Sequence, residues 1–165
     1  MRKWQVLVGA VVVFCFWVLQ AAAYDGTDFD GIRKLAEQGN AEAQMKLGVM
    51  LSSGVGVAKD REEGLKWYRK SADQGYPPGQ WNLAFAYVRG EVLPQDFAKA
   101  LELFRQAAES GYDSAQYDLG MMYLQGVGVP PDQARAEVWF RRAAAQDNRE
   151  AKKILKELAA SSGGK

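Results

Sequence analysis

The sequence repeats itself every 36 residues, and this periodicity limits the fold more than any other feature of the chain. Three glycines set the register, and the same step links three glutamines, three leucines and three aspartates. These positions are Gly39, Gly75 and Gly111; Gln44, Gln80 and Gln116; Leu47, Leu83 and Leu119; and Asp60, Asp96 and Asp132. A unit of this length cannot bury its apolar face alone, so we expect the units to stack on one another.

Each unit has the pattern of two helices joined by a glycine-containing turn. In the first unit, the apolar residues of 41–52 recur with the spacing of one helix face, as Ala43, Leu47, Met50 and Leu51. Gly54 then permits the left-handed turn at the helix end, and Asp60 is a good N-cap for a second helix. The second helices are expected to close at Gly75, Gly111 and Asp147. The pattern predicts an all-α fold, an α-α solenoid (superhelix) of helix-turn-helix repeats.

The same frame divides the chain into parts. We expect a solenoid over 24–160, formed by a half-repeat helix at 28–38, repeats at 39–74, 75–110 and 111–146, and a capping helix at 148–160, with a disordered tail at 161–165. The three periodic glutamines should hydrogen-bond backbone groups between helices, because a buried amide needs partners. Small residues recur where helices should approach closely, at Gly48, Ala84 and Gly120 and at Gly64, Ala100 and Ala136.

Residues 1–23 have the composition of an export signal. A short basic start precedes the uncharged run 6–19, and small residues at 21–23 end the segment. This arrangement is typical of a signal peptide that is cleaved, here before Tyr24. The alternative is an uncleaved membrane anchor, because the apolar stretch approaches the roughly 20 residues that span a bilayer. The first interpretation predicts a periplasmic or secreted protein, and the second an inner-membrane anchor facing the periplasm.

The residue types of the chain exclude several kinds of chemistry. The chain has no histidine, and its one cysteine, Cys15, lies inside the export segment. Ser-His-Asp triads, Cys-His pairs and zinc sites with the usual ligands are therefore excluded, and we expect no metal and no cofactor. The formal net charge is +1, and no basic stripe is interleaved with aromatic residues. Nucleic acid is therefore not expected as a partner.

The periodic residues resemble the Sel1-like repeat, a relative of the tetratricopeptide repeat. The third unit carries the pattern of that family most fully, in Ser114-Ala115-Gln116, Leu119-Gly120, Tyr123, Gly126-Val127-Gly128-Val129, Asp132 and Trp139-Phe140. The second unit departs from it, with Pro77-Pro78-Gly79 at its start and Ala84 in place of a glycine. The resemblance implies an adaptor or scaffold, often periplasmic, that assembles complexes or regulates enzymes.

One face of the first helix in each unit carries apolar and aromatic residues opposite the inward face, where a stacked solenoid would have its concave groove. The candidate partner-binding residues on this face are Val49, Trp81, Phe85, Arg89, Tyr117, Met121 and Gln125. Exposed aromatic rows often anchor protein interfaces. The alternative is that these side chains pack against neighbouring helices within the solenoid.

The leading hypothesis is an exported, non-catalytic scaffold that binds a protein of the cell envelope in its groove. A second hypothesis comes from the resemblance, because some cysteine-rich members of the family are β-lactamase-like, penicillin-binding or peptidoglycan-binding enzymes. Here the chain beyond the leader has no cysteine, and the serines Ser52, Ser53, Ser71 and Ser110 lack the lysine three residues on that β-lactamases carry. A third hypothesis is a membrane-anchored regulator, which requires that the leader persist.

Overall fold

The computed structural model describes residues 28–162, so the predicted leader at 1–23 lies outside the described residues. Within 28–162 the regular secondary structure is entirely α-helical, which confirms the predicted all-α class. The helices are α2 (Phe29–Glu37), α3 (Ala41–Ser53), α4 (Arg61–Asp73), α5 (Pro77–Arg89), α6 (Phe97–Glu109), α7 (Asp113–Gln125), α8 (Gln133–Ala145) and α9 (Arg149–Ser162).

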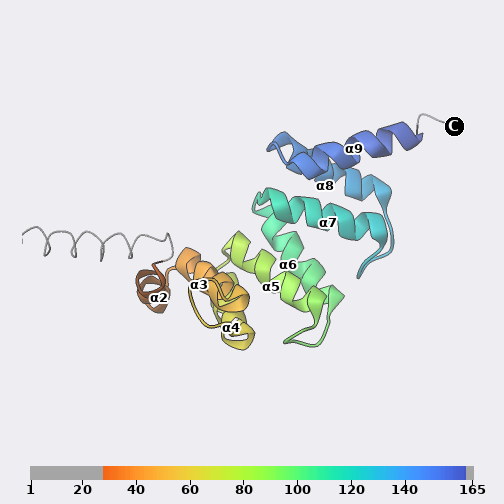
Figure 1. The fold of residues 1–165 in the computed structure, drawn as a ribbon. Helices are drawn as coiled ribbons and strands as arrows, with labels where there is room; N and C mark the ends of the chain where they lie inside the picture. Colours follow the sequence, from red (N-terminus) through yellow and green to blue (C-terminus); the bar gives the residue numbers. More distant parts are fainter. Residues whose placement is uncertain (1–27, 163–165) are drawn as a thin grey trace, which may run out of the picture.

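The helices stack in chain order as a solenoid (Figure 1). The hairpins α3–α4, α5–α6 and α7–α8 form the three repeats, and each helix contacts the next one along the chain. α3 also contacts α5, so the first helices of the first two repeats touch directly. α2 lies at one end of the array and α9 at the other (Figure 1).

The second helix of each repeat begins where the sequence predicts. Asp60, Asp96 and Asp132 each accept a hydrogen bond of 2.9 Å from the backbone N–H three residues later, which satisfies one of the unpaired donors at a helix start. At the other end of these helices, Gly75 and Gly111 have φ values of 73° and 91°. Asp147 replaces a glycine there with a φ of 67°, a region that aspartate tolerates better than most residues.

The last helix ends later than predicted. α9 continues to Ser162, so the first two residues of the expected disordered tail are helical, and 163–165 lie outside the described residues. The alanines that precede Ser161 favour helix, and no glycine interrupts the segment before Gly163.

Small residues let the two helices of each repeat approach closely, as predicted. A Cβ added to Gly64 on α4 would lie 2.8 Å from the backbone oxygen of Gly48 on α3, so these helices meet with no room for a side chain. A Cβ added to Gly120 would lie 2.6 Å from the ring of Phe140, which is fully buried. The small residues at the remaining crossing positions are also fully buried: Ala84, Ala100 and Ala136.

Two of the three periodic glutamines make the predicted contacts. The side-chain Nε2 atoms of Gln44 and Gln116 donate to the backbone oxygens of Ala36 and Ala108, each at 3.1 Å. Their Oε1 atoms accept hydrogen bonds from glutamines that end the second helices, Gln74 and Gln146. Each buried amide is therefore satisfied on both sides.

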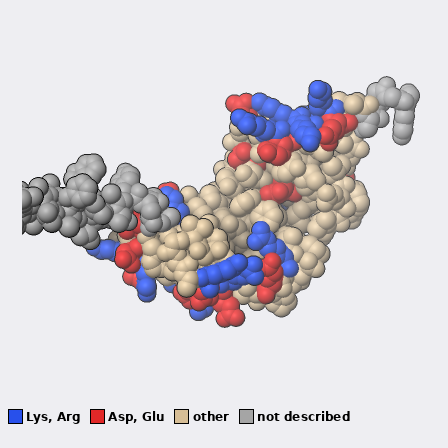
Figure 2. All heavy atoms as spheres, in the orientation of Figure 1, with Lys and Arg blue, Asp and Glu red and all other residues tan. Residues whose placement is uncertain are grey.

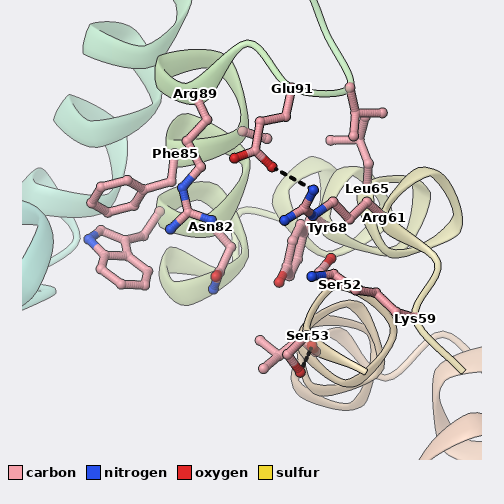
Figure 3. A pocket seen from close by; sticks show the side chains of 14 residues that line it. Ser52, Ser53, Lys59, Arg61, Leu65, Tyr68, Asn82, Phe85, Arg89 and Glu91 are labelled. Atoms are coloured by element: carbon pink, nitrogen blue, oxygen red, sulfur yellow. Dashed lines mark hydrogen bonds and ion pairs between the residues drawn. The ribbon is translucent and has the colours of Figure 1, made fainter. Parts of the chain in front are cut away.

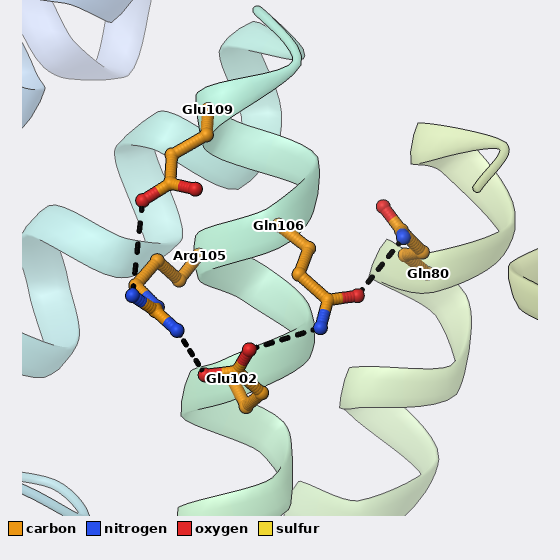
Figure 4. Close-up of polar contacts among 5 residues, drawn as sticks. All are labelled: Gln80, Glu102, Arg105, Gln106 and Glu109. Atoms are coloured by element: carbon orange, nitrogen blue, oxygen red, sulfur yellow. Dashed lines mark hydrogen bonds and ion pairs between the residues drawn. The ribbon is translucent and has the colours of Figure 1, made fainter.

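Gln80 departs from the prediction. Its Nε2 donates to Oε1 of Gln106 at 3.0 Å rather than to the backbone, and its buried Oε1 has no hydrogen-bond partner within the described part of the chain. The cause is Ser110, a short side chain at the position where the other repeats carry a donor glutamine. Gln106 in turn donates to Glu102, which also binds Arg105 (Figure 4).

A polar contact joins the second and third repeats. The indole N–H of Trp81 on α5 donates to the carboxylate of Asp118 on α7 at 2.7 Å. Burial raises the pKa of Asp118 to about 6, and the hydrogen bond from Trp81 offsets part of that shift. Asp118 is therefore ionised at neutral pH at a cost to the stability of the fold.

Ser110→Gln should increase the free energy of unfolding by about 1 kcal/mol, because the new amide can donate to the unpaired Oε1 of Gln80. Urea denaturation followed by circular dichroism measures the change. The control is the same substitution in a Gln80→Leu background, where the gain should vanish because the acceptor is absent. Equal gains in both backgrounds would attribute the effect to helix propensity instead.

Asp118→Asn should remove a loss of folding stability that depends on pH. The folded chain keeps the carboxyl protonated up to about pH 6, whereas the unfolded chain ionises it near 3.8, so wild-type stability falls relative to the variant as the pH rises between these values. Above them the difference stays constant. We expect denaturation of both chains from about pH 4 to pH 7 to show the gap growing by about 2 kcal/mol.

The indole donor provides the control for this effect. In a Trp81→Phe background the ionised form loses its hydrogen bond, so Asp118→Asn should produce a larger pH-dependent change. A gap that is independent of pH in both backgrounds would contradict the assignment.

Candidate partner-binding pocket

A pocket of about 550 Å³ lies between the first and second repeats (Figure 3). It is bounded by α3, by the first part of α4 and the turn before it, by α5, and by the loop that follows α5. The lining residues are Val49, Ser52, Ser53, Lys59, Arg61, Leu65, Tyr68, Trp81, Asn82, Phe85, Ala86, Arg89, Glu91 and Val92.

The α5 side of the pocket is aromatic. The ring of Phe85 makes edge-to-face contacts with Trp81, at a centroid distance of 4.7 Å, and with the buried Phe104 of α6, at 5.1 Å. These contacts hold the ring of Phe85 in one orientation while it still lines the pocket. Val49 adds apolar surface from α3 and is 40% exposed.

Cations outnumber anions in the lining. Arg61 forms an ion pair of 3.1 Å with Glu91, which links the start of α4 to the loop after α5 (Figure 3). Lys59 and Arg89 have no carboxylate partner within residues 28–162. The guanidinium of Arg89 lies 5.9 Å from the ring centroid of Phe85. The pocket therefore holds two positive charges that no acidic side chain of the described chain neutralises.

The surface charges of the molecule are unevenly distributed. On the face shown in Figure 2, charged side chains gather over the α4 and α5 region and over α8 and α9, with a largely uncharged stretch between them. The pocket draws residues from α4 and α5, which form the first of these two regions.

The base of the pocket supplies hydroxyl groups. Tyr68 is 9% exposed, and burial raises the pKa of its phenol. A hydrogen bond with Ser52 and the positive charge of Arg89 offset part of that shift. The phenol is thus neutral at physiological pH and can act as donor or acceptor.

Within residues 28–162, no group of three or more histidine, cysteine, aspartate or glutamate side chains is placed to hold a metal ion. No helix in that range has the length and apolar character needed to cross a membrane.

The structure brings four of the seven candidate groove residues together. Val49, Trp81, Phe85 and Arg89 all line the pocket. The other three, Tyr117, Met121 and Gln125, lie on α7 away from it.

The α7 residues have different surroundings. Tyr117 and Met121 are half-buried against a core cluster formed with α8 and α9, and the ring of Tyr117 lies 5.7 Å from that of Phe140. Gln125 is exposed at the end of α7. Trp81 and Phe85 are likewise half-buried, against the core cluster around Phe104, so all four side chains take part in packing within the solenoid.

Sequence reasoning identified Arg89 but missed the other three charged members of the pocket, Lys59, Arg61 and Glu91. They lie in turns or at a helix start, outside the face on which the groove was predicted. The sequence does carry a signal for them, because each charged pocket residue is replaced by an uncharged residue at the equivalent positions of the other two repeats. The equivalent residues are Gln95 and Pro131 for Lys59, Phe97 and Gln133 for Arg61, and Val55 and Val127 for Glu91, and the same holds for Arg89, with Ser53 and Gln125.

The chain is similar to several solved structures. A Sel1 repeat protein from Oxalobacter formigenes is 33% identical with a TM-score of 0.71, over 79% of this chain and 98% of that one. The protective antigen c5321 of uropathogenic Escherichia coli, which has an SLR fold, is 36% identical with a TM-score of 0.75. That match covers 79% of this chain and only 28% of c5321.

Helicobacter pylori cysteine rich protein B shares the fold, with a TM-score of 0.63 at 20% identity, over 78% of this chain and 98% of that one. The comparison with curated proteins gives no match.

A family model described as the Sel1 repeat matches residues 41–76, 77–112 and 113–148. Each matched unit begins two residues after the boundary expected from the glycines and has the same length. Proteins of this family typically serve as protein-interaction scaffolds and are generally non-catalytic. Since the three matched units account for α3 to α8, the chain belongs to the Sel1 repeat family.

Proposed function

We propose that this chain is an exported, non-catalytic scaffold that holds a protein partner of the cell envelope in the pocket between its first two repeats. The observation that carries the proposal is the lining of that pocket. It combines an oriented aromatic ring, Phe85, with two cations, Lys59 and Arg89, that have no carboxylate partner within residues 28–162. Buried aromatic and arginine anchors are the residues on which protein interfaces most often depend.

Export is inferred from the leader. Its basic start, apolar run and small-residue end favour a signal peptide, which would place the repeats in the periplasm or outside the cell. Membrane attachment enters the proposal only if the leader is retained. The non-catalytic part of the proposal is supported by the absence of histidine from the whole sequence and by a cysteine content limited to Cys15.

Photo-cross-linking in living cells tests the groove directly. A benzoylphenylalanine introduced at Val49, an exposed pocket residue, should give a specific adduct with an envelope protein. The matched control is the same group at Val138, an exposed valine of α8 outside the pocket, which should give none. Adding Phe85→Ala should abolish the adduct formed from position 49, in a chain shown to keep its helical content. Adducts from position 138 alone, or from neither position, would contradict the proposal.

The processing of the leader is a separate prediction. Mass spectrometry of the chain accumulated by a Gram-negative host should find a first residue of Tyr24, in a soluble envelope fraction. Replacing Ala23 and Ala21 by large residues should block cleavage, because the processing enzyme needs small side chains there. An intact leader in the membrane fraction of wild type would support the anchored form instead, and a full-length chain in the cytoplasm would overturn export.

A further inference from the structure

We propose that the pocket between α3 and α5 recognises an acidic polypeptide segment that carries an apolar side chain beside its carboxylates. The inference rests on the proposed scaffold function and names the chemistry of the segment that the scaffold holds. In this arrangement Arg89 and Lys59 bind the carboxylates, and Phe85 contacts the apolar side chain.

The net positive charge of the pocket favours a negatively charged ligand. Of its charged residues, three are cations and one is an anion, and the single internal ion pair uses Arg61 and Glu91. The excess positive charge remains on Lys59 and Arg89, which enter the pocket from opposite sides (Figure 3). An acidic segment that crosses the pocket can meet both, whereas a basic segment would meet like charge.

The position of Arg89 prepares it for a carboxylate. Its guanidinium is 5.9 Å from the centroid of the Phe85 ring, and its charge influences the pKa of the Tyr68 phenol. No hydrogen bond or ion pair within residues 28–162 uses the N–H groups of this guanidinium, so they are available to a ligand. A guanidinium in this state offers the paired donors that match a carboxylate.

Apolar side chains also line the pocket, so the charge of a ligand is only part of what the pocket can recognise. Phe85, Val49 and Leu65 line the same space as the cations. Its volume of about 550 Å³ is within the roughly 300–1,000 Å³ range of pockets that enclose ligands. A short peptide stretch with one large apolar side chain between acidic residues fits both properties of the lining.

The repeat itself shows that these charges are not needed for folding. The positions of Lys59, Arg89 and Glu91 are occupied by uncharged residues in both other repeats, which have the same helices. Lys59 and Arg89 are therefore a specific feature of this pocket and are not required for the helix pair to form.

Nuclear magnetic resonance titration of the ¹⁵N-labelled chain, purified in the form that the host accumulates, tests the inference. The probes are three capped peptides: Glu-Phe-Asp-Glu, its uncharged counterpart Gln-Phe-Asn-Gln, and Glu-Gly-Asp-Glu without the aromatic side chain. The indole N–H of Trp81 and the backbone amides of α3 and α5 report on the pocket. Binding is expected to be weak and fast, as for a short segment removed from its protein.

The acidic aromatic peptide should shift the pocket signals and bind about tenfold more tightly than either of the other two. The double variant Lys59→Ala, Arg89→Ala should bind the acidic aromatic peptide at least about tenfold more weakly than the wild-type chain does. A control that removes two exposed lysines of the end helices, Lys34→Ala with Lys156→Ala, changes the net charge equally and should leave the affinity unchanged.

Glu91→Gln gives a change in the opposite direction. It removes the only anion of the pocket and releases Arg61, so the acidic peptide should bind about threefold more tightly. A merely structural role for the Arg61–Glu91 pair predicts no gain. Because the pair is half-exposed, its loss should leave the helical content intact.

Equal binding of the acidic and uncharged peptides, shifts confined to other surfaces, or no shift at millimolar concentration would overturn the inference. If Glu-Gly-Asp-Glu bound as tightly as Glu-Phe-Asp-Glu, the proposed contact between Phe85 and an apolar side chain would be wrong. The scaffold function is judged separately by the adduct from position 49. An adduct without peptide binding would leave a partner that uses a different chemistry in this pocket.

Discussion

Where α3 crosses α4, any Cβ on residue 64 would lie 2.8 Å from the carbonyl oxygen of Gly48, so the two helices can meet at this distance only because that residue is glycine. The other repeats keep the crossing small with buried alanines, such as Ala100. Close approach brings the aromatic residue of the second helix against the first helix, where Phe104 and Phe140 are almost completely buried. A helix pair fixed in this way has one shape, and repetition of that shape produces the solenoid and its concave side.

Much of this architecture was predictable because it depends on residues that recur. The N-caps at Asp60 and its equivalents and the left-handed helix end at Asp147 follow from local backbone chemistry, which each unit must satisfy separately. Gln44 and Gln116 were also predictable, since their donors and acceptors recur with them. Gln80 was not, because its contacts depend on a second position, Ser110, where the period is broken.

The candidate site was predictable only in part, because the helix phase identifies a face and does not identify what covers it. On α5, Phe85 is half-buried against the core cluster around Phe104 but still lines the pocket together with Arg89. On α7 the same face is partly covered, because the end of the array must bury the apolar side of α9 and does so against the cluster that includes Tyr117 and Met121. The other three charged residues of the pocket come from the turn before α4, the start of α4 and the loop after α5, where the direction of the backbone depends on tertiary contacts and carries no periodic signal.

The pocket also lies at a joint. Its walls come from both the first and the second repeat, and the Arg61–Glu91 ion pair crosses from one to the other at the surface. In a linear stack, each repeat is positioned only through its neighbours, so the angle at one joint sets the direction of everything beyond it. A segment bound to α3 and α5 together would restrict changes in the angle between the first two repeats. Occupancy of this one pocket would therefore influence the length and curvature of the whole array.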